Sequence, residues 1–103
     1  MSGIRIRAEA KDGITSVRSL ITHPMESGLR KDSETDEPIP AQFIQELVCK
    51  WKDEVVLRAH WTGGVSKDPY LAFRFRGGEP GDPLEISWTD NLGQSASETT
   101  TIR

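Results

Sequence analysis

Apolar and polar residues alternate along most of the chain, a period of two that is typical of β-strands with one buried face. Turn-forming sequences such as Asp12-Gly13 and Gly63-Gly64 separate the alternating stretches. The pattern predicts an all-β fold: an antiparallel β-sandwich of about seven strands with Greek-key connections. Length alone predicts a single domain over residues 1–103. The predicted strands are residues 4–10, 14–23, 43–51, 55–61, 70–78, 84–90 and 95–103.

Most of these stretches are apolar on one face only, and that face is predicted to form the core. The short apolar run at residues 42–50, with turns nearby, favours a strand there over a helix. The predicted core residues are Ile4, Ile6, Ala8, Val17, Ile21, Phe43, Leu47, Cys49, Trp51, Val55, Leu57, Ala59, Trp61, Leu71, Phe73, Phe75, Leu84, Ile86 and Trp88.

Two predicted strands are apolar on both faces. In the second strand, Ile14 and Leu20 lie opposite Val17 and Ile21. One face of such a strand serves the core, and the other is available to a partner. The third strand repeats the pattern, with Ile44 and Val48 opposite its core set.

A long excursion, THPMESGLRKDSETDEPIPAQFI, joins the second and third predicted strands. Pro38 and Pro40 fix φ and predict an extended approach to the third strand. We expect Leu29 and Ile39 to anchor the excursion to the core. Residues 31–37 combine one basic with four acidic side chains, so we expect them to be exposed and mobile. A connection between the two sheets explains why the loop exists, but explains its length and charge less well.

Composition narrows the choice of partners. The net charge of −3 argues against a nucleic-acid partner, which requires clustered excess of lysine and arginine. No window approaches the length of about 20 apolar residues that a membrane span needs, so we expect no membrane partner. The first residues, MSGIRIRAEA, lack the apolar region of a signal peptide and, taken alone, indicate the cytosol. A single cysteine cannot form an internal disulfide.

Catalytic chemistry is not evident in the sequence. The two histidines, His23 and His60, are interpreted as surface or strand-end residues, although together with Met25 they could bind Cu(I) if the fold brought them together. The sequence contains no CxxC, HExxH, P-loop or GxGxxG motif. We therefore expect no catalytic residues, no cofactor and no metal site.

Three further groups of residues each have two readings. Cys49 is either a packed core thiol or a thiol that bonds a partner chain. The three tryptophans form part of the core or an aromatic platform for a sugar. Arginines on the first and fifth predicted strands form a solvated face, or an anion-binding row if those strands are neighbours. The arginines are Arg5, Arg7, Arg74 and Arg76.

Several stretches, taken together and in order, resemble one protein family. They are RIRA, THPMESGLRKD, IPAQFIQEL, VSKDPYLAFRFRG and WTDNLG, which span residues 5–93. The blocks HPMESGxRKD…IPAxFI and SKxPYxxFxF are the most specific. On these motifs the chain is similar to the Z-subunit family of the SoxYZ sulfur-carrier complex of periplasmic sulfur oxidation.

The resemblance implies an immunoglobulin-like sandwich and a non-catalytic role. It implies a heterodimer with SoxY, whose C-terminal Gly-Gly-Cys-Gly-Gly arm carries sulfur intermediates during thiosulfate oxidation and visits the Sox enzymes. Cys49 should then not be the carrier. The resemblance also implies a periplasmic location, reached by export with the signal-bearing SoxY, which reverses the cytosolic indication.

The motifs that carry the resemblance also suggest where partners bind. The predicted partner interface consists of His23, Pro24, Met25, Glu26, Pro38, Ile39, Pro40, Phe43, Ile44 and Val48.

An alternative function, in place of the sulfur-carrier role, is an extracellular β-sandwich module that binds a carbohydrate or another ligand.

Overall fold

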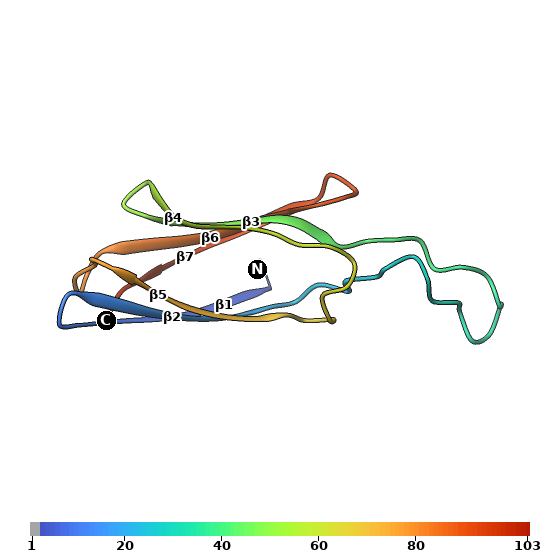
Figure 1. The fold of residues 1–103 in the computed structure, drawn as a ribbon, viewed down its shortest axis with the longest axis horizontal. Coiled ribbons are helices and arrows are strands. Elements are labelled where there is room, and N and C mark those ends of the chain that lie inside the picture. Colours follow the sequence, from blue (N-terminus) through green and yellow to red (C-terminus); the bar gives the residue numbers. More distant parts are fainter. Residues whose placement is uncertain (1–2) are drawn as a thin grey trace.

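The chain folds into two antiparallel β-sheets packed face to face, as the computed structural model of residues 3–103 shows (Figure 1). This confirms the predicted all-β sandwich. Over the described residues there are seven strands, and there is no helix that could cross a bilayer. The strands are β1 (Ile4–Lys11), β2 (Ile14–Ile21), β3 (Ile44–Trp51), β4 (Glu54–His60), β5 (Tyr70–Arg76), β6 (Pro83–Asp90) and β7 (Ser95–Thr101).

One sheet has three strands in the order β1-β2-β5, and the other has four in the order β4-β3-β6-β7. The chain therefore crosses between the sheets after β2, after β4 and after β5. The crossing after β2 is the predicted excursion. The crossing after β5 turns at Gly78, where φ is +87° and a Cβ atom would lie 2.0 Å from the hydroxyl of Thr15. Only glycine fits there.

The core lies between the sheets and is formed by alternate residues of β1, β2, β3 and β6. Residues of β4 and β5 pack against it but stay half-buried, among them Leu57, Phe73 and Phe75. The two sides of the sandwich differ. Beside β1, backbone hydrogen bonds join Ala10 and Ala8 to Arg103 and close the side. The other side is bounded by β4 and β5, which are the edge strands of their sheets.

Two irregularities, one in β3 and one in β4, change which residues face the core. The register between β3 and β6 shifts between Ile44 and Glu46, and the register between β3 and β4 shifts at Cys49. Each bulge adds a residue and reverses the alternation beyond it. Ile44 is thus fully buried, not on an outer face, and Val55 is 46% exposed, not in the core. Both sequence predictions were wrong for this reason.

Candidate partner-binding site

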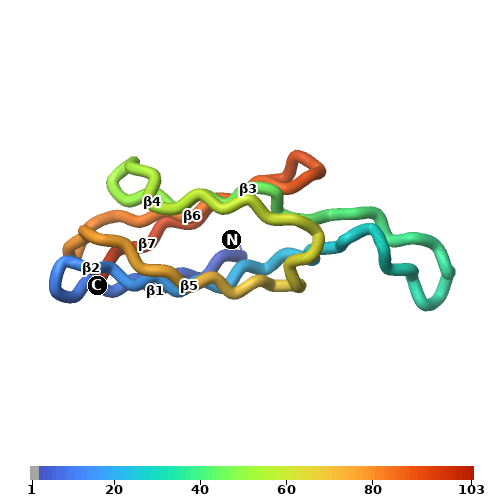
Figure 2. The backbone as a smooth tube through the Cα atoms, viewed as in Figure 1, coloured from blue at the N-terminus to red at the C-terminus, as the bar shows by residue number. Residues whose placement is uncertain are grey.

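The excursion forms a narrow two-stranded ribbon that extends the long axis of the molecule to 53 Å (Figure 2). We call residues 26–42 the arm. Paired backbone hydrogen bonds join Glu26 and Gln42 at its start, and the amide of Ile39 donates to the carbonyl of Arg30 further out at 2.9 Å. The arm is therefore a hydrogen-bonded element, whereas the sequence suggested a loop without pairing.

The tip of the arm is a compact turn. The Asp32 carboxylate accepts hydrogen bonds from the amides of Glu34 at 2.8 Å and Thr35 at 3.2 Å, and these bonds lower the pKa of Asp32. Residues 31–37 are all exposed, as predicted; their mobility stays a prediction. Leu29 is 91% exposed, so the prediction that it anchors the arm to the core was wrong. Ile39 is half-buried.

His23 fixes the root of the arm. Its imidazole is buried, and its Nε2 lies 3.1 Å from Oδ2 of Asp90. Its Nδ1 accepts a hydrogen bond from the amide of Met25, so Nε2 carries the proton and donates to Asp90. The ring of Trp88 contacts it edge-on, with centroids 4.8 Å apart. His23 therefore lies just past a strand end, which was one of the two predictions, but it is buried and not on the surface, whereas His60 is exposed as predicted.

The backbone of His23 is tied down as well. Its amide donates to the carboxylate of Asp68 at 3.0 Å, and its carbonyl accepts from the amide of Asp68 at 3.0 Å. Met25 follows with a backbone φ of 48°, which is unfavourable for a residue other than glycine. Burial of Met25 and a 3.3 Å contact from the amide of Ile44 to its sulfur hold this conformation.

Asn91 fixes the returning leg of the arm, by which we mean the half that leads back to β3; the outgoing leg is the half that follows Met25. Its side-chain oxygen accepts from the amide of Phe43 at 2.8 Å, and its side-chain nitrogen donates to the carbonyl of Ala41 at 2.9 Å. The loop after β4 presses on the outgoing leg: a Cβ atom at Gly63 would lie 2.8 Å from the Cα of Ser27. Both legs are thus braced where they leave the sandwich.

Four stretches far apart in sequence meet at this point. We call the set of residues that joins them the base. The stretches HPMESG, IPAQFI, VSKDPY and WTDNLG, which carry most of the family resemblance, each contribute to it. Parts of four motifs therefore meet where the arm leaves the sandwich, whereas RIRA and the YLAFRFR part of the motif VSKDPYLAFRFRG lie in β1 and β5. The base consists of His23, Met25, Phe43, Asp68, Asp90 and Asn91.

In many enzymes a histidine beside a carboxylate acts in catalysis by accepting a proton from the reacting group. Here both side chains are closed to solvent, with exposures of 2% for His23 and 0% for Asp90. Burial raises the pKa of Asp90, but hydrogen bonds from His23, Gln94 and Leu92 outweigh it and hold that pKa below its usual value. The pair is thus a buried, satisfied hydrogen bond that holds the base together.

The structure divides the ten predicted interface residues into two groups. His23, Met25 and Ile44 are buried and support the arm from inside. The others are wholly or partly exposed: Pro24, Glu26, Pro38, Ile39 and Pro40 on or beside the arm, Phe43 at the base, and Val48 on the outer face of β3. Asp68, Asp90 and Asn91 were missed, because the sequence does not reveal that the segment before β5 and the end of β6 both meet the end of β2.

The remaining candidates lie away from the arm. Cys49 is fully buried, as predicted, and burial raises the pKa of its thiol to about 12. Trp51, Trp61 and Trp88 belong to the core or pack against it, as predicted. His23 is not placed as a copper ligand, since both of its ring nitrogens are hydrogen-bonded, one to the amide of Met25 and the other to Asp90. Within the described part of the chain, no group of His, Cys, Asp and Glu could hold a metal ion.

Fold and site together define a seven-stranded β-sandwich with a braced, protruding arm. The family model for the sulphur oxidation protein SoxZ matches residues 4–101, almost the whole chain. The chain therefore belongs to the SoxZ family and is a component of the sulfur-oxidation system. No curated protein matches it.

Proposed function

We propose that the chain is the non-catalytic Z subunit of a SoxYZ sulfur carrier. In this role it forms a heterodimer with SoxY. It helps present the cysteine-bearing C-terminal segment of SoxY to the enzymes of thiosulfate and sulfur oxidation. The observation that supports this most is the convergence of four family motifs on the base of the arm. A protruding element that several residues hold in one orientation is typical of a surface that another protein binds.

The proposal assigns partner binding to the legs of the arm and the adjoining surface of β3. Pro38, Ile39 and Pro40 have restricted φ or apolar side chains, so they lose little conformational freedom on binding. Val48 adds an apolar, partly exposed side chain on the outer face of β3. The tip, at residues 32–37, is polar and carries no such anchor.

The test is a pull-down of purified SoxY with arm variants. Ile39→Glu and Val48→Glu each place a charge on the proposed surface, and we expect each to weaken SoxY binding by about tenfold or more. Ile44→Glu is unsuitable because Ile44 is buried in the core. Deletion of residues 33–36 from the tip should leave binding intact.

Val55→Glu is the matched control. Val55 is also apolar and partly exposed, but it lies beside the β3–β4 turn, at the end of the sandwich opposite the arm (Figure 1). It should leave SoxY binding unchanged. If both surface variants bind normally and the tip deletion does not, the tip is the contact and our assignment is reversed.

The proposed role also implies where the chain works and that its cysteine takes no part in the sulfur chemistry. The chain works in the periplasm, carried there with its signal-bearing partner. Cys49 does not carry sulfur, since a buried thiol with a raised pKa is a poor nucleophile. Thiosulfate turnover by the isolated chain would contradict the non-catalytic role.

A further inference from the structure

The outward face of the three-stranded sheet is strongly cationic. Strand register aligns its exposed residues in four rows, each of which takes one residue from β1, β2 and β5. The second row places Arg7 directly opposite Arg18. The other exposed cations of the face are Arg5, Lys11, Arg74 and Arg76.

These cations are separated from the acidic charge of the chain. The face holds six of the 13 basic residues and, in Glu9, one of the 16 acidic residues. Its net charge is therefore +5, while the rest of the chain carries −8. Among the described residues, the ion pairs are made by other side chains. Six like charges with a single acidic residue among them repel one another, which costs stability.

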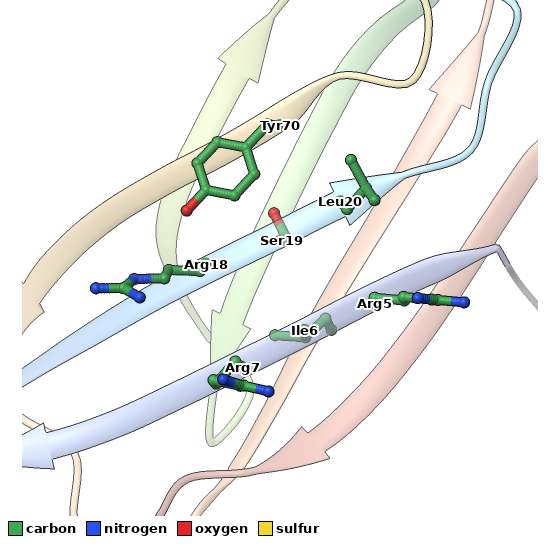
Figure 3. Close-up of a pocket in the computed structure, with 7 residues that line it drawn as sticks. All are labelled: Arg5, Ile6, Arg7, Arg18, Ser19, Leu20 and Tyr70. Carbon is green, nitrogen blue, oxygen red and sulfur yellow. The ribbon is translucent and has the colours of Figure 1, made fainter.

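Apolar side chains interrupt the cationic face at both ends. Leu20 is 42% exposed and Tyr70 63% exposed in the row nearest the arm, and Ile14 is exposed in the row farthest from it. The surface near Leu20 and Tyr70 is hollowed into a depression of about 240 Å³ (Figure 3). Charged residues around exposed apolar and aromatic ones are typical of a protein-binding surface.

We propose that this face binds an acidic surface of a second protein, separately from the SoxY contact assigned to the arm. Negative side chains of the partner would pair with the rows of arginine, and an apolar side chain would enter the depression beside Leu20 and Tyr70. The charge contrast of the chain would orient such a partner before contact.

The geometry favours a protein over a small oxyanion or a nucleic acid. In Figure 3 the guanidinium group of Arg18 points away from those of Arg5 and Arg7, which lie side by side in direction, and the three do not converge on one centre. A site for a single small anion would require such convergence. The net charge of −8 elsewhere on the chain would repel a long nucleic acid that extends beyond the face.

The probe is a fluorescein-labelled poly-L-glutamate peptide, with binding followed by fluorescence anisotropy on the full chain. We expect saturable binding at about 25 mM NaCl that weakens about tenfold at about 150 mM, because salt screens exposed charges. The double variant Arg7→Glu with Arg18→Glu should weaken binding by at least about tenfold. Both residues are exposed, so the variant should fold normally.

The matched control changes the same amount of charge on the other sheet. Lys50→Glu with Arg58→Glu alters the outer surface of the four-stranded sheet, on β3 and β4. If binding depends on the face and not on net charge, this control should bind poly-L-glutamate within about twofold of the unmodified chain. Equal losses in the two double variants would overturn the proposal.

Other results would also overturn it. Competition by sulfate or thiosulfate beyond the effect of NaCl at equal ionic strength would indicate a small-anion site. Tighter binding of a single-stranded oligonucleotide than of poly-L-glutamate would indicate a nucleic-acid site. Self-association abolished by the Arg7 and Arg18 reversals would identify the occupant as a second copy of this chain.

The poly-L-glutamate assay needs no SoxY, so its outcome is independent of the proposed function. Pull-down of SoxY by the Arg7 and Arg18 variant then tests the separation of the two surfaces. We expect normal SoxY binding. Loss of SoxY binding would make the cationic face part of the SoxY interface and overturn the separation, whatever the result with the arm variants.

Discussion

Asp90→Asn removes the negative charge at the base of the arm while keeping nearly the same shape. The imidazole Nε2 of His23 must donate, because its Nδ1 already accepts from the amide of Met25. The second carboxylate oxygen of Asp90 accepts from the amides of Leu92 and Gln94. Whichever way the new amide group turns, its NH₂ faces another donor.

The expected cost follows from these contacts. A hydrogen bond to a charged acceptor contributes about 1.5–3 kcal/mol, and a buried donor left without a partner costs about 1–3 kcal/mol. The free energy of unfolding should therefore fall by about 3–5 kcal/mol, within the sum of these two contributions. With an m-value near 2 kcal/mol per molar, the urea midpoint should drop by about 2 M.

Urea unfolding at several pH values gives a second check. The pKa of Asp90 is held below its ordinary value of 3.8, so the folded state favours the charged carboxylate. Its contribution is fully present above the unfolded pKa and is lost as the pH falls through the folded pKa. The stability gap between the unmodified chain and Asp90→Asn should be constant near neutral pH and narrow below pH 3.8.

Asp82→Asn is the matched control. The Asp82 carboxylate also accepts two hydrogen bonds, from the indole of Trp51 at 2.9 Å and from the amide of Glu79 at 3.0 Å, but it lies nearer the surface. It should shift the midpoint far less. A loss under about 1 kcal/mol for Asp90→Asn, or a gap that does not change in acid, would refute the role of Asp90 in bracing the arm.

Further expectations concern the core, the tip and a turn. The thiol of Cys49 should react with iodoacetamide only as fast as the chain unfolds, and Cys49→Ser should cost about 1–3 kcal/mol in urea unfolding; rapid labelling of the native chain would contradict its burial. Deleting residues 33–36 should change the melting temperature little, since loop closure entropy depends weakly on length; a large drop would mean that the tip is structural. Gly78→Ala should cost at least about 2 kcal/mol, because the new methyl group would overlap the Thr15 hydroxyl at a positive φ; an unchanged midpoint would contradict that close approach.

The alternation of apolar residues predicted the strands and most of the core. It succeeded where a strand is regular, as for Leu84, Ile86 and Trp88 on β6. It failed at Ile44 and Val55, which adjoin register shifts of β3. A bulge depends on the fit between neighbouring strands, so the sequence of one strand does not reveal it.

The candidate site was only partly predictable. The motifs and prolines marked the excursion, but not its pairing into an arm. His23 was predicted to be a surface or strand-end residue because its burial depends on Asp90, 67 residues away, which accepts a hydrogen bond from its Nε2. Leu29 was assigned to the core because it is apolar, although the ribbon carries it beyond the reach of the sandwich. Long-range partners decide such cases, and periodicity contains no information about them.

The tethering of His23 has a consequence for the order of folding. Its partners lie 45 and 67 residues further along the chain, on the segment before β5 and at the end of β6. The direction of the arm is therefore set only after both sheets have assembled, since contacts between distant residues form late. A protein that recognises the oriented arm would select completed chains and ignore partly folded ones.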